Sequence, residues 1–365
     1  MKKDWTYKKL GEVCDINYGT RVVQKKDGGS IYPVYGGGGA TFRMDTYNRE
    51  DCLVVARFAM SPKCTRIVKG KFFLNDSGLT LDAHEELYQD YLNWHIISLN
   101  DEIYQTAKGA AQKNLDVKAF TSLKIAIPPL SIQRSIVAEL DLLHSVISKK
   151  KEQLRELDNL AQSLFYQMFG APITNPMGWE IKKLGEVAPV KSYQGDIVSE
   201  KGLYWLLNLD MVEAQTGKIL EKNMLDKDEI GNSTTSFSPD NVLYSKLRPY
   251  LNKVVLPDTC GYCTTELLPL LPQKDILNRE YLCYLLRSKS FVDYINTKVA
   301  GAKMPRVTMD DFRNFPIPLP PLSLQQSFSA KVSAIEAQKQ AITQSIKETE
   351  ALLAQRMDTY FLVNA

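Results

Sequence analysis

Apolar residues recur at seven-residue spacing in two long stretches, one in the middle of the chain and one at its end. The first stretch fills two seam positions over four heptads with Leu140, Leu143, Ile147, Leu154, Leu157 and Leu164. The second stretch fills them with Val332, Ile335, Ile342, Ile346 and Leu353. Lys150 interrupts the first seam and Lys339 the second. A heptad sustained this long predicts two coiled-coil helices, each about 60 Å long at 1.5 Å per residue.

Proline, serine and glycine residues mark where these helices are expected to begin and end. A proline pair stands before each stretch, at 128–129 and at 320–321, and proline is tolerated in the first turn of a helix but not in its interior. Ser131 and Ser323 follow the proline pairs and are the expected N-caps. Gly170 comes where the first helix is expected to stop.

Each helix needs a partner, because an isolated helix with a narrow apolar stripe is marginally stable in water. The nearest available partner is the other stretch of the same chain, and we expect the two helices to pair. The alternative is that each helix lies on the surface of its own globular domain.

The chain also repeats itself at the ends of two halves. Residues 5–13 return at 179–187 with seven of nine positions identical, at an offset of 174. Residues 128–135 return at 320–327, at an offset of 192. The larger second offset means that the middle of the second copy is longer. A shared scaffold that carries two different inserts explains this pattern.

The repeat predicts the fold class and the domain organisation. We expect an α+β protein with an internal pseudo-two-fold repeat, in which two α/β globular domains are joined by two long antiparallel helices that form a coiled coil. The expected parts are 1–128, 129–170, 171–319 and 320–365, alternating domain and helix. Within the domains we expect the strands Asp51–Ala56, Asn241–Ser245 and Lys253–Leu256, and the helices Glu85–Asn100 and Asn278–Thr297.

Composition narrows the class of protein. The 365 residues contain 45 Lys and Arg against 42 Asp and Glu, so any nucleic-acid surface must be a local patch. The six cysteines show no disulfide framework and the first residues show no signal-peptide pattern, so we expect a reducing cytoplasmic location. No apolar run approaches the ~20 residues that span a bilayer, and we expect no membrane association.

Basic and aromatic residues gather at four places that we take as candidate DNA-binding sites. The first is a glycine-rich stretch with Arg21, Lys25, Tyr35, Gly36, Gly37 and Arg43. The second contains Lys246, Arg248, Tyr250 and Lys253. The third and fourth occupy one place in the repeat, with Lys108, Gln112 and Lys113 in the first copy and Lys303 and Arg306 in the second.

The chemistry of these residues suits DNA. Arginine reads guanine through two hydrogen bonds, lysine neutralises phosphates, and glycine lets a backbone approach a phosphate closely. Each place also has a purely structural interpretation: a flexible loop for the first, a solvated edge between strands for the second, and a capping turn for the last two.

Catalytic motifs are missing from the sequence. The three histidines are not spaced as metal ligands, and Cys260 and Cys263 form a single pair where a zinc site needs four ligands. No phosphate-binding loop occurs. Asp258 and Glu266 suggest a nuclease pair, but Leu268 stands where its lysine would be. We therefore expect no catalytic residue, no metal and no cofactor on this chain.

Three motifs together resemble one family. They are the Trp-x-x-Lys-Lys-Leu-Gly-Glu-Val that opens each half, the Pro-Pro-Leu-Ser-x-Gln before each long helix, and the Leu-Arg-Pro-Tyr-Leu-Asn-Lys of the second half. The chain resembles the specificity (S) subunit of type I restriction–modification systems over nearly its whole length. By this resemblance, each globular domain is a target recognition domain for one half of a split, asymmetric site on double-stranded DNA, and the coiled coil sets the spacer.

The resemblance also implies partners. Methyltransferase (M) subunits, two for each such chain, would bring S-adenosylmethionine, and restriction (R) subunits would bring ATP and Mg²⁺. The residues that match the family's recognition regions are Tyr35, Gly36, Gly37, Arg248, Tyr250 and Lys253. Two other functions stay open: a DNA-modifying enzyme fused to its own recognition domain, which would itself bind S-adenosylmethionine, and a coiled-coil scaffold that never contacts DNA.

Overall fold

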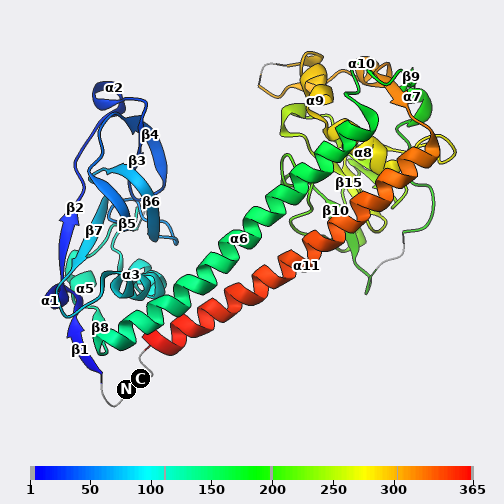
Figure 1. The fold of residues 1–365 in the computed structure, drawn as a ribbon. Coiled ribbons are helices and arrows are strands. Elements are labelled where there is room, and N and C mark those ends of the chain that lie inside the picture. Colours follow the sequence, from blue (N-terminus) through cyan, green and yellow to red (C-terminus); the bar gives the residue numbers. More distant parts are fainter. Residues whose placement is uncertain (1–4, 111, 198–199, 302, 363–365) are drawn as a thin grey trace. The chain divides into compact units, whose positions relative to one another are not determined.

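A computed structural model describes residues 5–110, 112–197, 200–301 and 303–362 (Figure 1). The chain forms two compact units. Unit 1 comprises Met1–Lys151 and Gln344–Ala365, and unit 2 comprises Glu152–Thr343. The two long helices, α6 (Leu130–Phe169) and α11 (Leu322–Phe361), each contribute one part to each unit. No helix in the described ranges combines the length and apolar character needed to cross a membrane.

A six-stranded sheet forms the centre of unit 1. Its strand order is β2 (Cys14–Tyr18), β7 (Gly78–Ala83), β5 (Arg49–Ala56), β6 (Thr65–Leu74), β3 (Tyr32–Tyr35) and β4 (Ala40–Met44). Only the β3–β6 pair is parallel. The helices of this domain are α1 (Leu10–Val13), α2 (Gln24–Asp27), α3 (Gln89–Ser98), α4 (Asn100–Thr106) and α5 (Val117–Thr121). Strands β1 (Thr6–Lys9) and β8 (Lys124–Ile127) pair separately.

Unit 2 divides its strands among smaller sheets. One has the order β11 (Asn223–Leu225), β10 (Tyr204–Leu207), β15 (Gly261–Thr264) and β12 (Thr234–Phe237). Another has the order β14 (Val254–Val255), β13 (Val242–Ser245) and β16 (Leu267–Leu270). The remaining pairs are β17 (Val299–Ala300) with β18 (Arg306–Val307), and β19 (Pro316–Leu319) with β9 (Glu180–Lys183). The helices are α7 (Leu184–Val187), η1 (Leu209–Met211), η2 (Lys227–Glu229), η3 (Pro249–Leu251), α8 (Arg279–Arg287), α9 (Lys289–Asn296) and α10 (Met309–Arg313).

The repeated sequence ends form repeated structure. The strand and helix that open each half, β1–α1 and β9–α7, lie 174 residues apart. The elements that close each half, α5–β8–α6 and α10–β19–α11, lie 192 residues apart. Both long helices have 40 residues. The predicted shared scaffold with two different middles is confirmed.

One buried glutamine after each proline pair ties the scaffold together. Gln133 accepts a hydrogen bond from the Tyr88 backbone N–H (2.7 Å) and donates to two carbonyl oxygens. Gln325 does the same with the Asn278 N–H (2.8 Å) and two carbonyls. Both side chains are fully buried. An unmet hydrogen-bonding group inside a core is unfavourable, so the three bonds specify glutamine at this position.

Within unit 1, the parts of α6 and α11 run antiparallel. Glu139 pairs with Arg356 (2.8 Å) on α11, and Lys151, further along α6, pairs with Glu350 (2.7 Å), which comes earlier on α11. Lys150, which interrupts the predicted seam, donates to the Ser345 hydroxyl on α11.

Within unit 2, the same two helices also run antiparallel. Asp158 of α6 pairs with Lys339 of α11 (2.6 Å), and Phe165, further along α6, packs against Phe328, which comes earlier on α11. Ring centroids of Phe169 and Phe328 lie 5.3 Å apart. The predicted antiparallel coiled coil is therefore present in each unit.

The predicted seam residues lie away from solvent. Leu140, Ile147, Val332, Ile335 and Ile346 are buried, and Leu143, Leu154, Leu157, Leu164, Ile342 and Leu353 are half-buried. Seam residues also belong to the core of each unit: Leu140 and Leu353 pack in the core of unit 1, whereas Leu157 and Val332 pack in that of unit 2. The stripe therefore serves both helix pairing and domain attachment.

Three local expectations were wrong. The long helices begin at Leu130 and Leu322, so Ser131 and Ser323 lie inside the first turn and are not N-caps; the preceding proline carbonyls accept the first helical bonds. The helix expected over 85–100 begins only at Gln89 and is followed, after Leu99, by α4. The helix expected over 278–297 breaks at Ser288, which has an extended backbone and whose hydroxyl caps α9 by accepting from the Phe291 N–H.

Candidate nucleic-acid interface

The loop that follows β13 in unit 2 presents the motif that carries Arg248. Arg248 and Asn252 both have φ of +50°, which is unfavourable for residues other than glycine. The turn between them is anchored, because the Arg248 N–H donates to the Pro305 carbonyl (2.8 Å) and the Asn252 amide donates to the Arg287 carbonyl (3.0 Å). These two hydrogen bonds therefore hold the loop in a fixed conformation.

Arg248 and Tyr250 project from this loop into solvent. Both side chains are exposed, Tyr250 by 48%. In the described part of the chain, the Arg248 guanidinium makes no hydrogen bond or ion pair. Its donors are free for an external acceptor such as a base edge or a phosphate.

Three other basic candidates of unit 2 have partners within the protein. Glu266 pairs with Arg306 (2.9 Å) and lies 3.9 Å from Lys246. The hydrogen bond to Glu266 raises the pKa of Arg306. Lys253 donates to the Leu209 carbonyl (2.6 Å), and burial lowers the pKa of its ammonium. Lys303 is exposed. The structure thus brings Lys246, Arg248 and Arg306 together but leaves Arg248 as the available one.

The glycine-rich loop of unit 1 packs against its own domain. A Cβ on Gly36 would meet the Asn75 side chain at 2.6 Å, and one on Gly37 would meet the Phe58 carbonyl at 2.7 Å. Both positions are buried, and the Tyr35 ring packs edge-on against Phe72. Close packing against the protein explains these two glycines, whereas Gly38 is exposed and faces open space.

The remaining basic candidates of unit 1 are spread over its surface. Arg21 and Lys25 are exposed, Lys25 on α2. Arg43 donates to the Ile31 carbonyl (2.5 Å). Lys108 pairs with Asp116 (2.6 Å) beside an exposed Gln112, and the Lys113 ammonium lies 4.1 Å from the Tyr104 ring centroid. These side chains do not form one tight cluster by any contact of the described residues.

Sequence reasoning missed Arg57, at the end of β5. Its carbonyl accepts from the Leu115 N–H (2.8 Å), as that of Lys246 accepts from Val307 (2.9 Å), so the two residues occupy one place in the repeated loop. The offset between them is 189, neither of the two offsets seen in the repeated ends. The available signal was a buried strand followed directly by a cation in both halves, Arg57 after β5 and Lys246 after β13.

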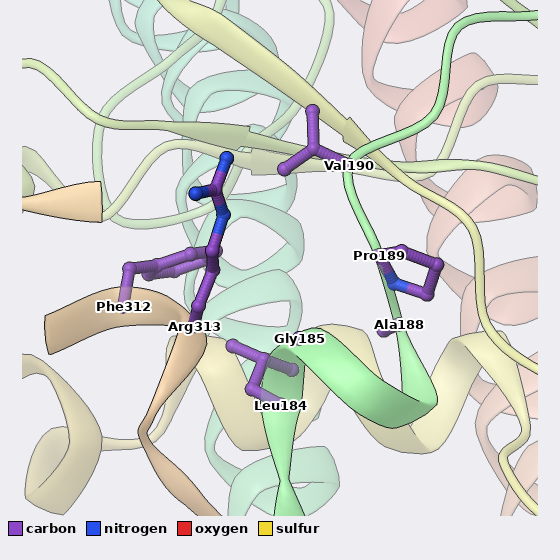
Figure 2. Close-up of a pocket in the computed structure, with 7 residues that line it drawn as sticks. All are labelled: Leu184, Gly185, Ala188, Pro189, Val190, Phe312 and Arg313. Atoms are coloured by element: carbon purple, nitrogen blue, oxygen red, sulfur yellow. The ribbon is translucent and has the colours of Figure 1, made fainter. Parts of the chain in front are cut away.

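A small pocket lies elsewhere in unit 2, between α7 and α10 (Figure 2). The Arg313 side chain rises on one side of it, and Pro189 and Val190 line the other. Gly185 lies at its base, where a Cβ would meet the Arg313 side chain at 3.0 Å. Among the described residues, no three His, Cys, Asp or Glu side chains are grouped to hold a metal ion.

The fold and these surfaces define a class: a duplicated α+β protein in which two unlike domains on a common scaffold each expose basic and aromatic residues. Comparison with known proteins gives the family. The family described as the type I restriction modification DNA specificity domain matches residues 2–159 and 176–350. The chain belongs to this family, and the resemblance noted in the sequence is confirmed.

Individual relatives agree with the family. The chain is 18% identical to the EcoDI type I restriction enzyme specificity subunit of Escherichia coli, over 95% of this chain and 85% of that protein. It is 22% identical to the MjaVIII specificity subunit of Methanocaldococcus jannaschii, over 73% of this chain and 69% of that protein.

Solved structures show the same fold. The S subunit of the type I restriction–modification system of M. genitalium is 13% identical and superposes with a TM-score of 0.62, covering 99% of this chain and 97% of that one. A chain from a structure on complex assembly and conformational transition of the type I R-M system gives 0.53 at 18% identity, covering 100% and 99%.

Proposed function

We propose that this chain gives a type I restriction–modification complex its DNA specificity by reading a bipartite, asymmetric site, one half with each unit. The supporting observation is the repeated scaffold with unlike middles. Unit 1 carries a six-stranded sheet where unit 2 carries separate sheets of four and three strands. Identical domains would read a palindrome, whereas different domains read two different half-sites.

The two antiparallel helices set the distance between the half-sites in this proposal. A helix is stiff and rises a fixed 1.5 Å per residue, so helices of equal length define a constant spacing. The family match and the names of the relatives support the role in DNA specificity that this spacing would serve.

The chemistry belongs to partners in this proposal. Methyltransferase subunits, two per chain, carry S-adenosylmethionine, and restriction subunits, where present, use ATP and Mg²⁺ in the cytoplasm. This chain binds no cofactor, contributes no catalytic residue, and positions its partners on double-stranded DNA.

The test is to co-express the chain with a methyltransferase subunit of the same system and to map modified adenines in the host DNA. The expected result is one asymmetric motif of two short half-sites separated by a fixed number of unspecified bases. Footprinting of the purified complex should protect the same two half-sites. Modification at unrelated sequences, or no bipartite protection, would contradict the proposal and favour a scaffold.

A second measurement addresses the rival enzyme function. The purified chain alone is titrated with S-adenosylmethionine in a calorimeter. We expect no binding to the chain alone and binding to the complex. Stoichiometric binding to the isolated chain would assign the methyltransferase site to this chain.

A further inference from the structure

Arg57 lies against two exposed aromatic rings on the surface of unit 1. Its guanidinium carbon is 4.6 Å from the ring centroid of Tyr18 and 4.6 Å from that of Phe58. The two rings are 44% and 39% exposed. Cation–π attraction fixes the orientation of a guanidinium, and exposed aromatic residues that cluster around it mark a contact surface.

The backbone beneath Arg57 is fixed as well. The Arg57 N–H donates to the Ser77 carbonyl (2.8 Å), and its carbonyl accepts from the Leu115 N–H (2.8 Å). Two residues further on, Ala59 has a φ of +48° and its N–H donates to the Asn114 side chain (3.2 Å). A side chain whose backbone and plane are both held loses little conformational entropy when it binds.

The N–H groups of Arg57 are still available. In the described ranges its guanidinium makes no hydrogen bond or ion pair, unlike its neighbours. Arg49 donates to the Thr80 hydroxyl (3.0 Å), and Arg66 donates to the Gly37 carbonyl (2.7 Å). Arg57 is thus a preorganised fork of donors that finds no hydrogen-bond acceptor among the described residues of its domain.

The surroundings favour a base edge as the acceptor. Guanine presents O6 and N7 side by side in the major groove, which matches the two N–H groups of a planar guanidinium. The rings of Tyr18 and Phe58 would then lie against neighbouring bases, whose methyl groups and faces accept apolar contact. A phosphate offers the same charge but no apolar surface for the rings.

We propose that Arg57, held against Tyr18 and Phe58, reads one guanine in the half-site that unit 1 binds. The proposal rests on the function proposed above and names a residue and a base for it. The residue at the same place in unit 2 is Lys246, which faces Glu266. Lys246 lacks the planar fork, so the proposed contact has no counterpart at that place in unit 2.

The test uses the complex of this chain with its methyltransferase subunit and a duplex that carries the mapped target. Each guanine of both half-sites is replaced in turn by 7-deazaguanine, which still pairs with cytosine but lacks the N7 acceptor. For the unaltered complex we expect roughly tenfold weaker binding at one guanine of one half-site when N7 is removed, the size of one good base contact.

The variants identify the partner of that guanine. Arg57→Ala should bind the normal target roughly tenfold more weakly and lose no further affinity when that guanine is modified. Arg57→Lys keeps the charge and a donor but not the fork, so its loss at the modified guanine should be smaller than that of the unaltered complex. Arg134→Ala is the matched control, since Arg134 lies 5.8 Å from the ring centroid of Tyr88 in the same unit; it should keep the original pattern of sensitivity.

Three results would overturn the assignment. Arg57→Ala could retain the full sensitivity at every guanine. It could weaken all sequences equally and make binding less dependent on salt, which marks a phosphate contact. The unaltered complex could be indifferent to the modification throughout. Failure of the unaltered complex to prefer its mapped target over unrelated DNA is a different result, because it refutes the proposed function itself.

Discussion

Units 1 and 2 build the loop after their central strand with the same backbone bonds but with different side chains. Arg57 and Lys246 share one place in that loop, yet Arg57 lies against aromatic rings while Lys246 faces Glu266. Arg248, two residues later, is exposed and makes no hydrogen bond or ion pair with the described residues of unit 2. The comparison shows that the same backbone bonds can hold one place in the loop while the side-chain chemistry presented there changes.

The scaffold behaves in the opposite way, because its chemistry is the same in both units. Tyr91 donates its hydroxyl to the Ala126 carbonyl (2.9 Å), and Tyr281 donates to the Pro318 carbonyl (2.7 Å). Gln133 and Gln325 make matching sets of three bonds. Interior bonds tolerate little change, since an unmet buried group is unfavourable by about 1–3 kcal/mol.

The sharpest test of equal scaffolds is to remove the glutamine from each. Gln133→Leu leaves one N–H and two carbonyls unmet in unit 1, and Gln325→Leu does the same in unit 2. We expect each to lower the free energy of unfolding of its unit by about 4 kcal/mol, from three lost partners that partly find water. Urea unfolding monitored separately in the two units measures both.

The adjacent residue provides the control for that comparison. Gln326 is exposed, and Gln326→Leu should change the free energy of unfolding by less than about 0.5 kcal/mol. A loss in one unit more than twice that in the other would show that the two scaffolds are not equivalent.

The parts of the fold that could be predicted are those that leave a repeating pattern in the sequence. The seven-residue spacing predicted the long helices, and near-identical blocks such as 5–13 and 179–187 predicted the duplicated ends. The middles could not be predicted, because their sheets are held by pairings between distant strands. The parallel contact of β3 with β6, for example, joins Val34 to Phe73 and leaves no local pattern.

The candidate sites were predictable as stretches but not as residues. The sequence indicated the segment around Arg248, but it could not show that Glu266 pairs with Arg306 and faces Lys246. Glu266 lies in the turn just before β16 and Arg306 lies in β18, so the pair forms only when these strands pack together. Arg57 was missed because it is singled out by its contact with the Tyr18 ring, and Tyr18 lies 39 positions earlier in the chain, at the end of β2.

One difference between the cores of units 1 and 2 is the buried His95 of unit 1, and its effect is testable by pH. His95 is 1% exposed and stacks on the Phe361 ring, and burial lowers its pKa to about 3. The unfolded chain binds the proton near pH 6.5, whereas the folded unit does so only near pH 3. His95 therefore makes its full contribution to the stability of unit 1 above pH 6.5, and that stability falls as the pH drops toward 3.

We expect unit 1 to lose about 2 kcal/mol of stability between pH 7 and pH 5 through this residue. His95→Leu should abolish that loss, since leucine has no proton to bind. In unit 2 the corresponding buried residue of α8 is Leu285, which does not titrate. The stability of unit 2 should therefore be the same with and without the His95→Leu substitution. Equal acid sensitivity of unit 1 before and after the substitution would refute this account.

The contrast between occupied and available cations in unit 2 predicts unequal effects on DNA binding. Arg248→Ala removes an exposed guanidinium without an internal partner and should weaken specific binding by about 1.5 kcal/mol, or roughly tenfold. Arg306→Ala removes one that Glu266 already holds and should change binding by less than about 0.5 kcal/mol. Electrophoretic mobility shifts with the mapped target measure both, and a larger effect of Arg306→Ala would reverse the assignment.

The two lysines that interrupt the seam give the smallest and most discriminating prediction, because they have different partners. Lys339 pairs with Asp158 (2.6 Å) and Glu336 (2.9 Å) in unit 2. Among the described residues, Lys150 of unit 1 donates to the hydroxyls of Ser345 and Thr349 and to no carboxylate. Ion pairs that are partly exposed contribute about 0.2–1 kcal/mol and weaken with salt. Apolar atoms added at a half-buried seam position contribute a similar amount in the favourable direction.

Lys150→Met should therefore stabilise unit 1 by about 0.5 kcal/mol at any ionic strength, because it adds apolar contact and removes no charged partner. Lys339→Met should destabilise unit 2 by about 0.5 kcal/mol at low salt, because two carboxylates lose their counter-charge, and this loss should shrink in 1 M NaCl. Thermal unfolding of both variants at low and high salt measures the signs. Equal signs at low salt would mean that the lysines play one role in the seam, and that the charge of their partners does not matter there.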